Sequence, residues 1–146
     1  MSNQTVLLVE DNPDDEALTL RAFKKNNIVN ELTVARDGQE ALDYFFGEGA
    51  SERPAPTMML LDLKLPKIGG LEVLRRIRAD PRTRLQPIVI LTSSKEEQDI
   101  ITGYSLGANS YIRKPVDFSQ FMEAIRQIGL YWLVLNEPAV QKGLSQ

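Results

Sequence analysis

The stretch Thr5-Val-Leu-Leu-Val9-Glu10-Asp11-Asn12-Pro13 decides the fold that this chain can adopt. Its first five residues form a continuous apolar run, which predicts a short strand buried on both faces, as in a parallel sheet. Asn12 can cap a following helix with Pro13 at its first position, and apolar residues at helical spacing continue to Asn26-Asn27. The stretch therefore predicts a buried strand that leads directly into a helix.

The same alternation of an apolar run and a helical stretch recurs along the chain. Further strands are predicted at residues 32–35, 58–61, 88–91 and 110–112. Helices are predicted to start at Asp37-Gly38, after Gly69-Gly70, after Ser94 or Lys95, and at Phe118, the last one running to about Leu135. Parallel strands need helical crossovers, and these are right-handed. The sequence therefore predicts an α/β fold: a doubly wound, five-stranded parallel sheet with helices on both faces, for which we take the flavodoxin-like strand order 2-1-3-4-5.

The length of the chain bounds its organisation. Its 146 residues correspond to one globular domain, at roughly 100 to 200 residues per domain. We expect residues 1–146 to form a single domain with a core over about 5–135 and a tail over 136–146. The Pro-rich, polar stretch 49–56 is typical of a surface loop inside that domain. A separate output domain is not expected.

The composition excludes several classes of chemistry. The chain has no Cys and no His, which excludes disulfides, Cys-based zinc sites, thiol nucleophiles and imidazole bases. Its net charge of −3 does not favour nucleic acid. The amino terminus has no basic region before its apolar run, and that run is far shorter than the roughly 20 residues that span a bilayer. We therefore expect a cytoplasmic protein that binds neither nucleic acid nor membrane.

Polar residues follow the predicted strands at one edge of the sheet, where open α/β sheets bind their ligands. These residues are Glu10, Asp11, Asp62, Thr92 and Lys114. Two carboxylates about 4 Å apart repel each other by roughly 4 kcal/mol at an effective dielectric constant of about 20. Such a cluster must therefore keep a proton or hold a cation. Oxygen ligands favour Mg²⁺, Mn²⁺ or Ca²⁺ over zinc.

Each of these residues has an ordinary interpretation when it is taken alone. A strand-end Thr92 is commonly just a β-branched residue, and Lys114 is commonly a solvated charge; their coincidence at one edge favours a site. A divalent ion bound by Asp11 and Asp62 could also hold a phosphoryl oxygen, which leaves a second Asp62 oxygen as nucleophile for in-line attack on phosphorus. Lys114 would balance the remaining charge, and Thr92 would donate a hydrogen bond to the new group. The combination predicts a phosphorylation switch.

In this order along the chain, the residues resemble the receiver domain of two-component response regulators. The motifs that carry the resemblance are Val9-Glu10-Asp11-Asn12, Leu61-Asp62-Leu63-Lys64-Leu65-Pro66 with Gly69-Gly70, Leu91-Thr92-Ser93 and Tyr111-Ile112-Arg113-Lys114-Pro115. The resemblance spans about Thr5 to Leu135 and implies a flavodoxin-like, CheY-like fold. It also implies a protein that accepts a phosphoryl group from a sensor histidine kinase in a Mg²⁺-dependent reaction.

The resemblance assigns a role to each site residue. Asp62 would be the phosphoacceptor, and Lys114 would contact the phosphoryl group. The metal ligands would be Asp11, Asp62, the backbone carbonyl of Lys64 and, through water, Glu10. Thr92 and Tyr111 would form the switch pair. The metal would be Mg²⁺, with Mn²⁺ as a substitute. Tyr111 would move inward behind Thr92 when Asp62 is phosphorylated. Such a protein is a switch and not an enzyme, with only slow autodephosphorylation.

A narrower resemblance concerns the partner. The run Glu10-Asp-Asn-Pro-Asp-Asp15, the Pro-rich stretch and the extended carboxyl terminus resemble stand-alone regulators paired with bacterial and cyanobacterial phytochromes. This resemblance implies a sensor histidine kinase as partner, either of the phytochrome type or another one. We expect output through protein contact and not through DNA binding.

The carboxyl-terminal helix gives a separate signal. Phe121, Met122, Ile125 and Ile128 suffice to face the sheet, yet residues 130–135 are apolar on all sides. Trp132 and its neighbours are therefore expected to cover another surface, and the simplest candidate is a homodimer through the helix 118–135. The alternatives are a tail folded back over its own domain and, less favoured because basic residues are sparse, a helix lying on a membrane.

Three other function classes use some of the same features. A metal-dependent phosphatase of the haloacid-dehalogenase type also forms an aspartyl intermediate, but it has Asp-x-Asp at its nucleophile, whereas Lys64 here leaves no general acid. A flavin-binding module would need a hydroxyl-rich or Gly-rich phosphate loop after the first strand, where two carboxylates stand instead. A purely structural dimer would not need the intact set of site residues.

Overall fold

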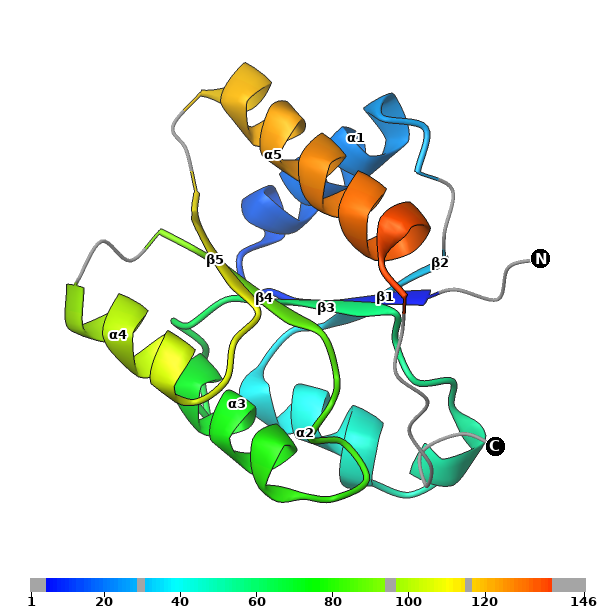
Figure 1. The fold of residues 1–146 in the computed structure, drawn as a ribbon, viewed down its shortest axis with the longest axis vertical. Coiled ribbons are helices and arrows are strands. Elements are labelled where there is room, and N and C mark those ends of the chain that lie inside the picture. The colour runs from blue at the N-terminus through cyan, green and yellow to red at the C-terminus, as the bar shows by residue number, and fades with distance from the viewer. Residues whose placement is uncertain (1–4, 29–30, 94–96, 115–116, 138–146) are drawn as a thin grey trace.

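The structure is a computed structural model that describes residues 5–28, 31–93, 97–114 and 117–137. These residues contain one five-stranded parallel sheet in the order β2-β1-β3-β4-β5 (Figure 1). The strands are β1 (Thr5–Val9), β2 (Glu31–Ala35), β3 (Met58–Leu61), β4 (Ile88–Thr92) and β5 (Ser110–Arg113). The predicted fold and strand order are confirmed.

Helices cover both faces of this sheet. They are α1 (Pro13–Lys25), α2 (Gly38–Phe46), α3 (Gly70–Ala79), α4 (Glu97–Ser105) and α5 (Phe118–Leu130), with a 3₁₀ turn η1 (Ala50–Glu52) and a π-helical segment η2 (Tyr131–Leu135). Helices α1 and α5 lie on one face, and α2, α3 and α4 lie on the other (Figure 1). The turn η1 lies within the predicted Pro-rich loop.

The three central strands are buried on both faces. Every residue of β1, β3 and β4 is buried, which explains why their sequences are continuous apolar runs. Successive side chains point to opposite faces. Leu8 lies in the core cluster with Phe121 of α5, whereas Leu7 lies in the cluster with Phe45 of α2. Full burial of a side chain of this size stabilises the fold by about 1.5–3 kcal/mol.

Polar side chains fix where the first two helices begin. The Oδ1 atom of Asn12 accepts hydrogen bonds from the backbone N–H groups of Asp14 and Asp15, at 2.8 and 3.1 Å, as its predicted capping role requires. Asp37 accepts a hydrogen bond from the backbone N–H of Glu40 at 2.8 Å. These caps hold the strand-to-helix turns at the carboxyl edge of the sheet, where the predicted site lies.

The last helix differs from its prediction in geometry. A continuous helix is predicted from Phe118 to about Leu135, but α5 ends at Leu130 and the chain continues as the π-helical η2. At its end the backbone N–H of Asn136 donates to the Tyr131 carbonyl at 2.7 Å, which closes a five-residue turn. The wider turn places Leu133 in the core cluster of α1 and α5.

Trp132, which we expected to cover another surface together with its neighbours, contacts the core of its own domain. Trp132 is partly buried and packs against the same core cluster as Leu133. Its ring also meets the Tyr131 ring edge-on, with the centroids 5.0 Å apart. The apolar side chains that η2 and the end of α5 leave exposed are Leu130, Tyr131, Val134 and Leu135.

Some predictions fall outside the described residues. The predicted helix start after Ser94 or Lys95 lies there, and α4 is described from Glu97 onward. Residues 138–146 of the predicted tail lie there too. In the described part of the chain, no helix combines the length and apolar character needed to cross a bilayer.

Candidate functional site

Three carboxylates converge where β1 and β3 end. Val9 pairs with Leu61 across these parallel strands, so the residues that follow them, Glu10 and Asp62, leave the sheet side by side. With Asp11, they each offer a carboxylate oxygen within 4.8 Å of the others. Glu10 and Asp62 are buried, and Asp11 is exposed. The structure thus brings together the three acidic residues that the sequence singles out.

The environment of Glu10 opposes its negative charge. Burial raises the pKa of Glu10, the hydrogen bond and charge of Lys114 lower it, and the neighbouring Asp62 raises it; together they shift this pKa from 4.5 to about 7. A buried carboxylate beside a second one is a costly arrangement, and added positive charge relieves it. A cation near these carboxylates therefore stabilises their ionised form.

Lys114 supplies part of that charge. Its Nζ donates hydrogen bonds to Glu10 Oε1 at 2.6 Å and to Asp15 Oδ2 at 2.8 Å, and it lies 3.5 Å from Asp62 Oδ2. Burial acts to lower the pKa of Lys114, but the hydrogen bonds to Asp15 and Glu10 and the nearby charges outweigh it and raise that pKa above its ordinary value. The side chain, only 11% exposed, is therefore an ammonium cation at neutral pH.

Asp15 is the one member of this charge network that sequence reasoning missed. It lies in the first turn of α1, between Asp14 and Glu16. Three consecutive acidic residues at a helix start are explained by the helix dipole alone, so no pattern distinguishes the middle one. Only the folded arrangement, in which the Lys114 side chain reaches from the end of β5 to α1, brings its Nζ within 2.8 Å of Asp15.

Thr92 and Tyr111 lie on neighbouring strands. Thr92 is the last residue of β4 and is fully buried, and its carbonyl accepts a hydrogen bond from the Lys114 backbone N–H at 2.7 Å. Tyr111 on β5 pairs with Ile90, two residues before Thr92, so both side chains lie on the same face of the sheet. The Tyr111 ring lies 6.5 Å from that of Tyr104 on α4.

The loop after β3 holds Asp62 in place. The backbone N–H of Asp62 donates to the Val9 carbonyl at 3.1 Å, and the Lys64 N–H points to Asp62 Oδ1 at 3.4 Å. The start of α3 closes the loop from below, because Gly70 packs so tightly that a Cβ there would overlap the Asp62 carbonyl oxygen. The Lys64 side chain itself is exposed.

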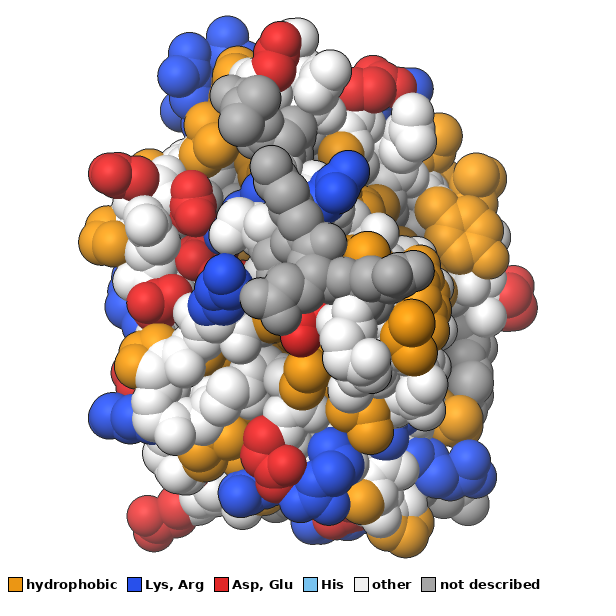
Figure 2. All heavy atoms as spheres, turned by 90° about the vertical axis from the view of Figure 1, so that its left-hand side faces the viewer, with side chains coloured by type: hydrophobic (Ala, Val, Ile, Leu, Met, Phe, Trp, Pro, Cys, Tyr) orange, Lys and Arg blue, Asp and Glu red, His pale blue; other side chains and the backbone are white. Residues whose placement is uncertain are grey.

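Charged side chains of both signs surround this edge. Lys67 lies 3.3 Å from Asp37, the cap of α2, and Arg36 lies 2.9 Å from Glu16 of α1. Figure 2 looks onto this side of the molecule and shows acidic and basic side chains interspersed. The described residues of this edge therefore carry charges of both signs.

The donor set fits a hard divalent cation. Carboxylate oxygens are the ligands that Mg²⁺ and Mn²⁺ prefer, and the described part of the chain offers one group of acidic side chains close enough to share an ion, namely Glu10, Asp11 and Asp62. This group also contains the two buried carboxylates, Glu10 and Asp62, that a nearby cation stabilises. The residues present therefore match the predicted metal.

Comparison with known proteins gives one consistent family. The family model for the response regulator receiver domain matches residues 6–126. The chain is 40% identical over 131 residues to the probable methanogenesis regulatory protein FilR2 of Methanothrix harundinacea, covering 90% of this chain and 84% of FilR2. It is 37% identical over 131 residues to the response regulator Rcp1 of Synechocystis sp., covering 89% of each.

Solved structures agree with the sequence matches. The phosphorylated cyanobacterial phytochrome response regulator RcpA is 36% identical and superposes with a TM-score of 0.87, over 95% of this chain and all of RcpA. The Mn²⁺-bound form of Rcp1 superposes with a TM-score of 0.85, over 94% of this chain and 99% of that structure. From the order of its strands, the carboxylates at their ends and these matches, we conclude that the chain belongs to the response regulator receiver domain family.

Proposed function

We propose that the chain, as one receiver domain over residues 1–146, is a phosphoacceptor switch in a two-component system. A sensor histidine kinase supplies the phosphoryl group, and Asp62 receives it. The observation that carries the proposal is the convergence of Glu10, Asp11 and Asp62 within 4.8 Å of one another, with the Lys114 ammonium 3.5 Å from Asp62. An acceptor, a cation site and a fixed positive charge are the parts that phosphoryl transfer needs.

In the transfer, an Asp62 oxygen forms a bond to phosphorus while the bond from phosphorus to the kinase histidine nitrogen breaks, and that nitrogen leaves with the electron pair. Asp11, Asp62, the Lys64 carbonyl and, through water, Glu10 would hold Mg²⁺, or Mn²⁺ in its place. The bound ion supplies positive charge that neutralises the phosphoryl oxygens. Lys114 and the Thr92 hydroxyl then act as donors to these oxygens.

The output follows from the two residues behind the acceptor. When the Thr92 hydroxyl turns toward the phosphoryl group, it leaves space on the face where the Tyr111 ring lies, and Tyr111 moves inward. Tyr111 and Tyr104 are in ring contact, so the movement changes the surface of α4 and β5. A partner protein reads this surface, and the net charge of −3 supports protein contact over DNA binding as the output.

The partner kinase is proposed to be of the phytochrome type and to meet this chain in the cytoplasm. The similarity to RcpA, a cyanobacterial phytochrome response regulator, over 95% of the chain supports this choice. The turnover expected of the isolated protein is slow loss of the phosphoryl group to water, and so we class it as a switch and not as an enzyme.

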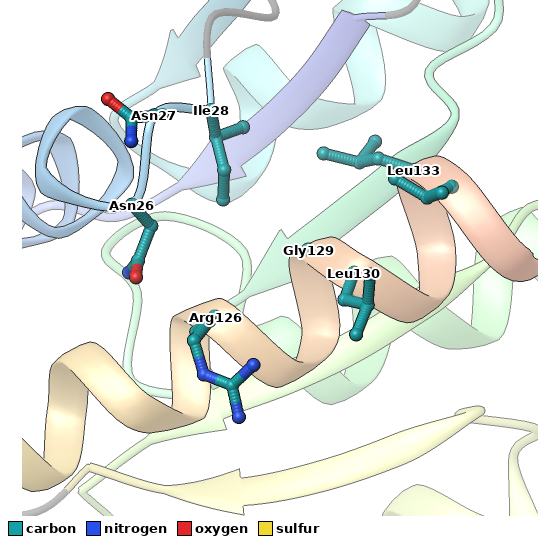
Figure 3. Close-up of a pocket in the computed structure, with 8 residues that line it drawn as sticks. Asn26, Asn27, Ile28, Arg126, Gly129, Leu130 and Leu133 are labelled. Carbon is teal, nitrogen blue, oxygen red and sulfur yellow. The ribbon is translucent and has the colours of Figure 1, made fainter.

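We also propose that two copies associate through the carboxyl-terminal segment 118–135. A hollow of about 250 Å³ separates the end of α1 from α5 and η2, with Asn26 to Ile28 on one side and Arg126 to Leu133 on the other (Figure 3). The exposed Val134 is one of the residues that line this hollow, and the exposed Leu135 follows it in the chain. A twofold interface uses the same patch on both copies, so the exposed apolar side chains of one copy would pack against this segment of the other.

The phosphoryl transfer is tested by the intact mass of the protein after incubation with acetyl phosphate, with and without Mg²⁺. We expect one added phosphoryl group that requires Mg²⁺ and is absent from Asp62→Asn. The control Asp43→Asn removes one carboxylate from α2 and should leave the adduct unchanged. A folded wild-type protein that gains no phosphoryl group under these conditions would contradict the proposal.

A further inference from the structure

The Lys114 ammonium lies at different distances from its three acidic neighbours. It makes hydrogen bonds of 2.6 and 2.8 Å to Glu10 and Asp15, whereas the 3.5 Å to Asp62 exceeds the usual range for an N–H···O hydrogen bond. An ammonium has three donors, and two of them are used on Glu10 and Asp15. The ammonium therefore lies closer to Glu10 and to Asp15 of α1 than to the acceptor.

Asp15 is firmly placed to hold it. Its backbone N–H is fixed by the Asn12 cap, and its carbonyl accepts a hydrogen bond from the Thr19 hydroxyl at 2.9 Å. Its side chain is 36% exposed, against 2% for Glu10 and 11% for Lys114. Of the two carboxylates that bind Lys114, Asp15 is thus the one that water can solvate when the ammonium leaves.

A phosphoryl group on Asp62 places about two negative charges beside Lys114, where the free carboxylate carries one. We propose that Asp15 is a positioning residue that holds Lys114 on α1 in the unphosphorylated protein and competes with the phosphoryl group for its ammonium. This inference rests on the proposed function, and it makes α1 part of the switch: phosphorylation must weaken the contact between Lys114 and Asp15. The cost of releasing Lys114 then lowers the stability of the phosphorylated state.

The test measures the affinity of the full chain for beryllofluoride, a phosphoryl mimic, in the presence of Mg²⁺, by titration followed in ¹H–¹⁵N NMR spectra. Asp15→Asn should bind it about three- to tenfold more tightly than wild type, as expected for the loss of one competing, partly exposed charge-assisted hydrogen bond. Asp15→Glu, which restores the carboxylate, should return the affinity toward the wild-type value.

Asp14→Asn is the matched control. Asp14 is the exposed neighbour in the same helical turn, so this variant removes the same charge from the same helix terminus. It should leave the affinity within about twofold of wild type. A second readout needs no phosphoryl mimic: the NMR signal of the Lys114 ammonium should shift in Asp15→Asn and not in Asp14→Asn.

The outcomes separate this inference from the function beneath it. If wild type binds no beryllofluoride and gains no phosphoryl group from acetyl phosphate, the proposed function fails. If wild type binds beryllofluoride but Asp15→Asn binds it with equal or lower affinity than Asp14→Asn, only the role of Asp15 fails. Weaker binding by Asp15→Asn would mean that Asp15 holds Lys114 ready for the phosphoryl group instead of competing for it.

Discussion

Gly70 matters to the site because it lacks a side chain. It begins α3 directly beneath the loop that carries Asp62, and a Cβ at this position would overlap the Asp62 carbonyl oxygen and crowd the Cα of Leu63. These backbone atoms cannot change position by a side-chain rotation. The loop itself would have to shift, and with it the carboxylate that we propose as phosphoacceptor.

We therefore expect Gly70→Ala to lower the free energy of unfolding by about 1–3 kcal/mol, the usual range for overpacking, and to slow phosphorylation by acetyl phosphate. Urea denaturation and intact mass measure the two effects. Gly69→Ala is the control, because the nearest atom to a Cβ there is the Leu63 carbonyl oxygen at 3.9 Å, an ordinary contact. Equal behaviour of the two variants would contradict this account of Gly70.

The cap residue of α2, Asp37, makes the stability of this helix depend on pH. The backbone N–H of Glu40 lowers the pKa of Asp37 below its ordinary value of 3.8, partial burial acts in the opposite direction, and Lys67 lowers the pKa further. When the folded-state pKa is the lower one, the unfolded chain binds the proton first as the pH falls. The contribution of Asp37 to stability is then present above its ordinary pKa and lost below it.

We expect the free energy of unfolding of wild type to fall more steeply below about pH 4 than that of Asp37→Asn, whose side chain caps a helix but does not titrate. Urea denaturation of both proteins between about pH 6 and pH 3 gives the two curves. Parallel curves over this range would show that Asp37 does not stabilise α2 through its charge.

At the level of the whole molecule, the segment formed by α5 and η2 has a buried side and an exposed side. One side carries Phe121, Ile125 and Leu133 into the core, and the other exposes Val134 and Leu135, which are 70% and 63% accessible. Exposed apolar side chains in a contiguous group commonly mark an interaction site. The fold needs only the first side, and the second is the side through which we propose that two copies associate.

We expect the full chain to be a dimer in light scattering after size exclusion, and Val134→Asp to shift it to the monomer because a charge in an apolar interface is costly. Leu85→Asp is the control, since it charges an exposed leucine outside segment 118–135. A wild-type protein that stays monomeric at high concentration would contradict the dimer and favour a tail folded over its own domain.

Sequence patterns predicted the fold because its signals are local. A strand buried on both faces must be a continuous apolar run, as β1, β3 and β4 are, and a helix start needs a cap such as Asn12. The position of Glu10, Asp11 and Asp62 at one edge follows from strand polarity alone. The sequence by itself thus determined the elements, their parallel arrangement and which residues could form a site.

Tertiary structure decided the contacts between elements distant in sequence. Lys114 and Asp15 are 99 positions apart, and nothing local distinguishes Asp15 from its acidic neighbours in α1. Likewise, apolar residues surround Trp132 on both sides, and only the π-helical turn of η2 places it against the core. Local patterns specify which elements form, whereas the partner of a charge or a ring depends on how the elements pack in three dimensions.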